Sequence, residues 1–110
     1  MNLATGLFSL LSEKKMTALQ RPAVLQLIRS ASSVAANYRA ATRGRSEAEY
    51  YSKICIVVEE CDETQFWLDF LLQTGILGVE ESLVQCRETL ELLKIFTVIK
   101  RKMKERLARK

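Results

Sequence analysis

Residues that interrupt helices are scarce along the whole chain. Its 110 residues include one proline and four glycines, and Leu, Ala, Glu, Lys and Arg, which favour helices, are abundant. The run KICIVV at residues 53–58 resembles a strand, but it lies inside a longer stretch of helical apolar spacing, so we interpret it as buried helix. The sequence therefore predicts an all-α protein, and its length suits a single domain over residues 1–110.

Two glycine-containing segments predict sharp turns between long helices. Gly44 follows a helical run and suits the left-handed residue that often ends a helix. Ser46 and Glu49 form a capping box, in which the Ser46 hydroxyl bonds the Glu49 amide and Glu49 reaches back to the Ser46 amide. The segment TGILG at residues 74–78 predicts the second turn. Helices joined by such short turns are expected to run antiparallel.

The first part of the chain predicts one short helix followed by a break. The break falls within residues 13–22, where Thr17 and Gln20 can cap the next helix and Pro22 is tolerated in its first turn. We expect four helices, over about 3–15, 21–43, 46–74 and 79–108. This order predicts an up-down four-helix bundle with a short first helix.

The chain contains no histidine. This absence excludes Ser-His-Asp and Cys-His catalytic arrangements and the Glu-x-x-His ligands of di-metal bundles. Acidic residues cluster at Glu59, Glu60, Asp62 and Glu63, but without histidine, and with arginines expected on the neighbouring helix, we do not interpret them as a metal site. We therefore expect a protein that is not an enzyme and that carries neither a cofactor nor a metal.

Three cysteines, Cys55, Cys61 and Cys86, fall within helical patterns. Cys55 and Cys61 are roughly 120° apart around one helix, so they cannot form a disulfide with each other. An odd number of buried thiols is typical of a reducing compartment, and we expect a cytoplasmic protein. The chain has no run of eighteen apolar residues, so we expect no membrane partner.

One face of the predicted helix over residues 21–43 carries small and polar side chains. At steps of four and three, this face contains Gln26, Ser30, Ser33, Asn37 and Ala40. Such a seam lets a second helix approach closely, so its first four members are candidate subunit-interface residues. Trp67 is a fifth candidate, because the apolar run at residues 66–72 exceeds what one core direction can cover. The alternative is that the small residues fill a crowded bundle interior.

The net charge of +4 is concentrated at the C-terminus. Residues 94–110 carry eight Lys and Arg against the single Glu105, whereas residues 1–93 carry nine against twelve acids. Candidate nucleic-acid-binding residues of this tail are Lys100, Arg101, Lys102, Lys104, Arg106, Arg109 and Lys110. A basic segment of this kind suggests a polyanionic partner, bound less tightly as salt rises. The alternatives are a solvated helix end, and a membrane-surface helix with Ile99, Met103 and Leu107 on its apolar side.

Arginines near the first predicted turn form a second basic group. Arg43 and Arg45 are candidate phosphate contacts, because a guanidinium group can bind phosphate through two hydrogen bonds. They could equally pair with acidic residues of the next helix. Arg29 lies deeper in its helix, opposite the acidic run, and we interpret it as a structural ion pair.

A continuous pattern over residues 26–72 also carries a family resemblance. It begins with Gln-Leu-x-Arg-Ser-Ala-x-Ser-Val-x-x-Asn at residues 26–37, continues with Arg-Ser at 45–46 before an acidic-aromatic start, and ends with an acidic helix reaching Trp-Leu at 67–68. This pattern resembles a family of four-helix-bundle proteins. That family includes the proteins encoded in intervening sequences of bacterial 23S ribosomal RNA genes and the accessory variability determinant of diversity-generating retroelements.

The resemblance implies a left-handed bundle that assembles as a ring, which we expect to be a homopentamer. It also implies a basic surface that binds nucleic acid and a reverse transcriptase, as in the accessory protein of the retroelements. Our first hypothesis is a non-enzymatic, homo-oligomeric bundle that binds RNA or DNA as an accessory factor to a nucleic-acid enzyme such as a reverse transcriptase. The alternative is a protein-interaction scaffold with no nucleic-acid role.

Overall fold

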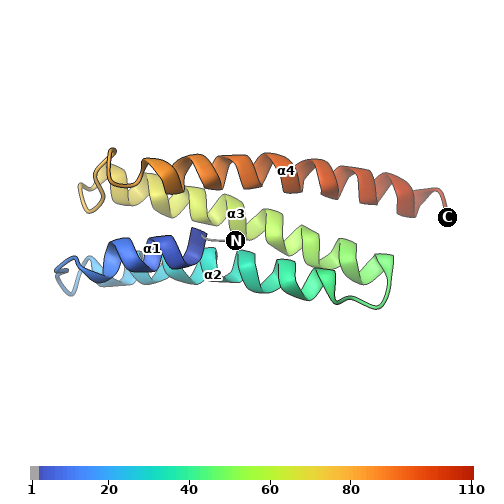
Figure 1. Ribbon diagram of the computed structural model, residues 1–110, viewed down its shortest axis with the longest axis horizontal. Helices are drawn as coiled ribbons and strands as arrows, with labels where there is room; N and C mark the ends of the chain where they lie inside the picture. Colours follow the sequence, from blue (N-terminus) through green and yellow to red (C-terminus); the bar gives the residue numbers. More distant parts are fainter. Residues whose placement is uncertain (1–2) are drawn as a thin grey trace.

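Four α-helices make up the computed structural model, which describes residues 3–110 (Figure 1). They are α1 (Leu3–Ser12), α2 (Arg21–Thr42), α3 (Glu47–Gln73) and α4 (Leu83–Ala108), and no strand occurs in the described range. Successive helices run in alternating directions, with α1 and α3 each packed against α2 and α4. The predicted all-α fold of four helices with a short first helix is confirmed.

The helix boundaries differ from the expected ones mainly in α1 and α4. α1 ends at Ser12 rather than near residue 15, and α4 begins at Leu83 rather than near residue 79. Before α4, the Gly78 N–H donates a hydrogen bond to Glu81 Oε1 at 2.8 Å. The Ser82 hydroxyl then donates to the Gly78 carbonyl at 2.7 Å. These local side-chain bonds hold the segment in turns and delay the helix.

The expected Thr17–Gln20 pair forms, but it closes a turn before α2, and the N-cap residue of α2, Gln20, makes no side-chain capping bond. The Thr17 N–H donates to Gln20 Oε1 at 3.1 Å, and the Gln20 N–H donates to Thr17 Oγ1 at 3.2 Å. Pro22 lies in the first turn of α2. Lys14 forms an ion pair of 2.7 Å with Glu81 of the α3–α4 loop. Both loops therefore meet at one end of the bundle, which we call the loop end.

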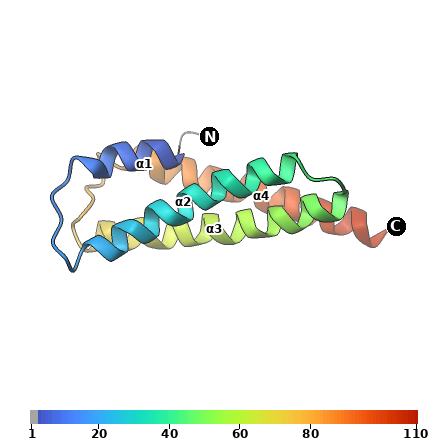
Figure 2. The same cartoon turned by 90° about the horizontal axis from the view of Figure 1, so that it is seen from below.

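The core is divided along the bundle axis because α1 covers only part of its length (Figure 1, Figure 2). Toward the loop end, one buried cluster contains Leu3, Leu7, Leu11, Val24, Leu27, Ala31, Leu68, Leu71 and Leu77. Beyond α1, a second cluster is built by α2, α3 and α4 from Val34, Ala41, Ile54, Val57, Cys61 and Phe96. The molecule is consequently a rod of 52 × 21 × 20 Å whose far end is a three-helix section.

An aromatic pair joins α2 to α4 in the three-helix section. The ring centroids of Tyr38 and Phe96 are 5.3 Å apart. Phe96 is 4% exposed and Tyr38 is 36% exposed, so the tyrosine lies over the buried phenylalanine. The pair covers the side of the core that α1 leaves open.

Candidate nucleic-acid interface

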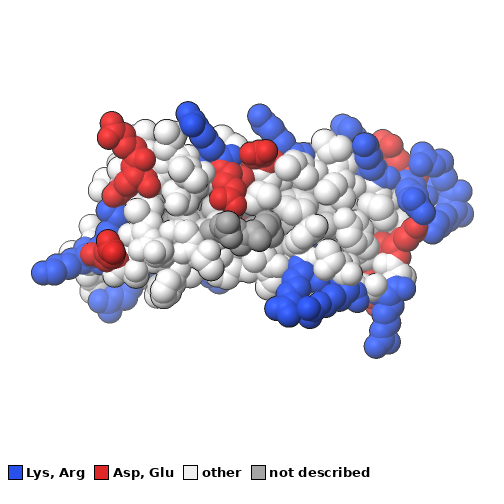
Figure 3. Space-filling model, in the orientation of Figure 1, with Lys and Arg blue, Asp and Glu red and all other residues white. Residues whose placement is uncertain are grey.

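The two basic groups singled out in the sequence lie at the same end of the bundle. α2 passes into α3 through the turn at residues 43–46, and α4 runs antiparallel to α3, so its last turns lie beside the start of α3 (Figure 1, Figure 2). Figure 3 shows Lys and Arg side chains gathered there, at the right of the view. We call this the basic end, and its cations are Arg39, Arg43, Arg45, Lys53, Lys100, Arg101, Lys102, Lys104, Arg106, Arg109 and Lys110.

Arg43 and Arg45 lie in the α2–α3 turn, which is stabilised by backbone hydrogen bonds and not by ion pairs of the two arginines. Ser46 caps α3 as predicted, since its Oγ accepts a hydrogen bond from the Glu49 N–H at 3.1 Å. Glu49 Oε2 accepts from the Arg45 N–H at 2.6 Å, rather than from the Ser46 N–H as expected. Arg43 and Arg45 are exposed, and neither forms an ion pair with a residue between 3 and 110. Both guanidinium groups are therefore available to an anion.

Gly44 does not adopt the left-handed conformation predicted for it. Among residues 3–110, positive φ occurs at Gly75, with a value of 79°. α2 ends instead through short hydrogen-bonded turns, in which the Gly44 N–H donates to the Ala41 carbonyl at 3.1 Å. A Cβ on Gly44 would lie 3.2 Å from that carbonyl oxygen. Close backbone packing therefore favours glycine here.

The last turns of α4 present their cations to solvent. Lys100 is partly buried, and the other six tail cations are exposed. Ile99, Met103 and Leu107 are partly buried instead, and Ile99 packs against the second core cluster. The apolar side of the tail is thus turned toward its own bundle, and its charged side faces outward.

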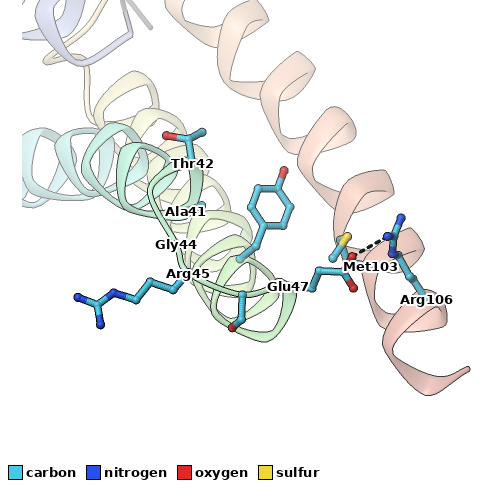
Figure 4. Close-up of a pocket in the computed structure, with 9 residues that line it drawn as sticks. Ala41, Thr42, Gly44, Arg45, Glu47, Met103 and Arg106 are labelled. Carbon is cyan, nitrogen blue, oxygen red and sulfur yellow. Dashed lines mark ion pairs between the residues drawn. The ribbon is translucent and has the colours of Figure 1, made fainter. Parts of the chain in front are cut away.

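Glu47, which the sequence did not single out, lies between α3 and the tail. Its Oε1 is 2.6 Å from Arg106 Nη2 (Figure 4), and its Oε2 pairs with Lys110 Nζ. The hydrogen bond from Lys110, followed by that from Arg106, lowers the pKa of the Glu47 carboxyl. Glu47, Arg106 and Arg45 all line a surface hollow of about 640 Å³, and the Arg45 side chain points away from α4. The antiparallel register could have revealed Glu47, because the first turn of α3 must face the last turns of α4.

Arg29 forms the structural ion pairs that the sequence favoured. Its Nη1 lies 2.9 Å from Glu60 Oε2, and its Nη2 pairs with Glu63 Oε1. The hydrogen bond from Arg29 is the largest cause that lowers the pKa of Glu63. This network engages the Arg29 guanidinium with two of the four carboxylates of the acidic run, as expected for a structural ion pair.

Two candidate interface residues, Gln26 and Trp67, line one apolar hollow. The hollow is about 570 Å³ and also includes Leu19 and Phe70. Trp67 contacts Phe66 and Phe70 edge-on, with ring centroids 4.9 and 5.5 Å away. Leu19 is 90% exposed at the rim. The structure thus brings these two candidates together on an apolar face near the loop end.

The other three candidates follow α2, but Ser30 lies inside the protomer rather than on an outer seam. Ser30 is 0% exposed. Its hydroxyl donates to the Leu27 carbonyl at 3.0 Å and accepts from Thr64 Oγ1 of α3 at 3.0 Å. Ser30 therefore fills the crowded interior of the bundle, which was the alternative to a subunit interface, and its small side chain allows close α2–α3 packing. Ser33 and Asn37 are partly buried, and the Asn37 amide donates to Ser33 Oγ at 2.9 Å.

Other chemical groups contribute little to this site. Cys55, Cys61 and Cys86 are free thiols, and burial raises the pKa of Cys61 to about 11. In the described part of the chain, no three Cys, Asp or Glu residues are grouped so as to hold a metal ion. None of the helices within residues 3–110 has the length and hydropathy needed to cross a membrane.

Comparison with known proteins extends the resemblance over nearly the whole chain. The family model described as 23S rRNA-intervening sequence protein matches residues 1–106. This chain belongs to the 23S rRNA-intervening sequence protein family. The relationship inferred from residues 26–72 is confirmed, and the match to the intervening-sequence family includes α1 and most of α4.

A solved structure supports the same assignment. It is the crystal structure of a protein of unknown function from the S23 ribosomal protein family of Bacteroides thetaiotaomicron VPI-5482. The two proteins are 28% identical, with a TM-score of 0.72 over 90% of this chain and 85% of the other. No protein among the curated sequences matches this intervening-sequence family member.

Proposed function

We propose that this protein is a non-enzymatic helical bundle whose basic end binds RNA or DNA. One observation carries the proposal. Arg43 and Arg45 are separated from the tail at residues 100–110 by more than fifty positions, yet folding places both groups at one end. Most of these cations are exposed, and the phosphate backbone of a nucleic acid is the polyanion that such a surface suits.

Self-association is the second part of the proposal, and it rests on the family resemblance and the apolar hollow. The hollow holds Gln26 and Trp67, while Ser33 and Asn37 continue the seam along α2. A homopentameric ring would present five basic ends and concentrate positive charge. Such a ring would act in the cytoplasm as an accessory factor to a nucleic-acid enzyme such as a reverse transcriptase.

The alternative function is a protein-interaction scaffold without a nucleic-acid role. The exposed aromatic group around Trp67 favours it, because large apolar side chains grouped on a surface are typical of protein contacts. In that case the basic end would be a solvated end of the bundle that complements the dipole of α4.

Native mass measured together with salt-dependent binding distinguishes the two functions. Light scattering on a sizing column gives the subunit number, and titration of a labelled structured RNA and a duplex DNA across salt gives affinity and slope. We expect an oligomer whose binding weakens steeply as salt rises. An oligomer that binds neither nucleic acid at low salt would support the scaffold instead.

A further inference from the structure

Glu47 is a carboxylate placed among the cations that a phosphate backbone would contact. It uses both oxygens, one for Arg106 and one for Lys110. The side chains of Glu47, Arg106 and Lys110 are 32%, 60% and 57% exposed, respectively. The three groups, which we call the Glu47 cluster, are therefore open to solvent and to a competing anion.

Two other acidic residues lie nearby but do not hold these cations. Glu49 Oε2 accepts the backbone N–H of Arg45, which ties it to the α2–α3 turn. Glu105 is exposed and forms no ion pair in the described structure. Lys102, Lys104 and Arg109 have no carboxylate partner there either. Of the tail cations, Arg106 and Lys110 alone are paired in residues 3–110.

We infer that Glu47 is an internal competitor of the nucleic acid. In the free protein its carboxylate occupies Arg106 and Lys110, and the phosphates of a bound strand take over both cations. This inference rests on the proposed function, because it assigns a regulatory residue to the same basic end.

The competition follows from the weakness of exposed ion pairs. Such pairs are screened by salt and contribute little individually, so a strand with several phosphates can displace one carboxylate. Each displaced pair is exchanged for a phosphate contact, and the net gain at Arg106 and Lys110 is small. The unpaired cations Lys102, Lys104 and Arg109 contribute their full attraction. Glu47 therefore limits the affinity of the protein for nucleic acid. Tight binding requires a strand that presents several adjacent phosphates.

Substitution Glu47→Gln tests this competition directly. It removes the carboxylate charge and keeps the size of the side chain. With a labelled RNA hairpin titrated from about 50 to 200 mM salt, we expect binding to tighten about three- to tenfold. The slope of log affinity against log salt should steepen by about 1–2, because up to two more cations contribute fully.

Two matched variants separate competition from a simple change in net charge. Glu105→Gln changes the net charge equally within the tail, and we expect less than about a twofold gain and an unchanged slope. Glu47→Gln placed in an Arg106→Gln, Lys110→Gln background should give no more gain than Glu105→Gln, because the cations it would release are gone. Equal gains from Glu47→Gln and Glu105→Gln would overturn the inference.

A comparison that keeps Glu47 in place gives an independent check. Arg106→Gln with Lys110→Gln should weaken hairpin binding less than about threefold, whereas Lys102→Gln with Lys104→Gln should weaken it about tenfold or more. Equal losses would contradict the inference even if a Glu47 variant failed to fold.

The outcomes also separate this inference from the proposed function. Hairpin binding by the unaltered protein with no effect of Glu47→Gln would overturn the inference alone. Binding by the Glu47→Gln variant but not by the unaltered protein would support it in its strongest form. Absence of binding by both at low salt would overturn the proposed function and the inference together.

Discussion

Arg29 joins two carboxylates of α3 and is the best-connected charged residue between α2 and α3. Its side chain is 48% exposed, but that of Glu60 is 13% exposed and would keep a poorly solvated charge without its partner. We predict that Arg29→Gln lowers the free energy of unfolding by about 1 kcal/mol at neutral pH. Urea denaturation measures this change. Arg39→Gln on the same helix is the control, and an equal loss there would contradict the role of the ion pairs.

The same ion pairs predict that the protein loses stability at acidic pH. Arg29 lowers the pKa of Glu63 below the ordinary carboxyl value of 4.5 in the folded state. A lowered carboxyl pKa contributes stability that is fully present above 4.5 and is lost as pH falls through the folded value. We predict a flat stability profile near neutral pH and a decline below this value. The decline should be shallower in Arg29→Gln, and an unchanged profile would contradict the assignment.

Ser30 and Ser33 are near neighbours on α2 with different surroundings. Ser30→Leu would force a large side chain into the α2–α3 contact beside Thr64, and we predict a destabilisation of about 1–3 kcal/mol or more. Ser33→Leu and Asn37→Leu should break the proposed oligomer before they unfold the protomer. Thermal melting and a sizing column separate the two effects. Full oligomer mass for both Ser33→Leu and Asn37→Leu would show that the seam lies within the protomer.

At this scale the sequence predicted charge pairing better than burial. Arg29 was predicted correctly because an acidic run lies opposite it on an antiparallel helix. The burial of Ser30 could not be predicted, because a helical wheel does not tell whether a small-residue face meets the chain's own α3 or another subunit. Glu47, in contrast, could have been found by placing the first turn of α3 against the last turns of the antiparallel α4.

At the scale of the elements, Gly75 is the position where glycine is required by backbone conformation. Its φ of 79° lies in the left-handed region, immediately after α3. We predict that Gly75→Ala destabilises the protein by about 1–2 kcal/mol. Gly78→Ala is the control, because its added Cβ would meet Glu81 at an ordinary 3.5 Å and its φ is not positive. Equal melting temperatures for the two variants would contradict this account.

Helix interiors were predicted from the sequence more reliably than helix ends. The expected bounds of α2 and α3 agree with the observed bounds to within a residue or two, and strong turn signals mark the junction between them and the end of α3. The start of α4 was misplaced because Glu81 and Ser82 bond the backbone of Gly78 and hold a turn where helix-favouring residues occur. The role of Gly44 was misassigned because α2 ends through backbone contacts that the sequence does not display.

The arrangement of the whole molecule was only partly readable from the sequence. The bundle and its family could be predicted from apolar periodicity and the motif over residues 26–72. The alternating helix directions already imply that the α2–α3 turn and the end of α4 share one end of the bundle (Figure 1), whereas the pairing of Glu47 with Arg106 and Lys110 became visible only in the structure. The opposite location of the aromatic hollow, near the loop end, gives the rod two chemically distinct ends.

The claim that the basic end binds nucleic acid is tested most directly by two variants of equal charge. Lys102→Gln, Lys104→Gln and Arg109→Gln remove three cations from the basic end. Lys15→Gln, Arg21→Gln and Arg87→Gln remove three exposed cations from the half nearer the loops. For a labelled structured RNA, we predict that the first variant lowers the salt slope by about 2–3, whereas the second leaves the slope nearly unchanged. Equal losses of slope and affinity in the two variants would show that net charge, and not the basic end, attracts the nucleic acid.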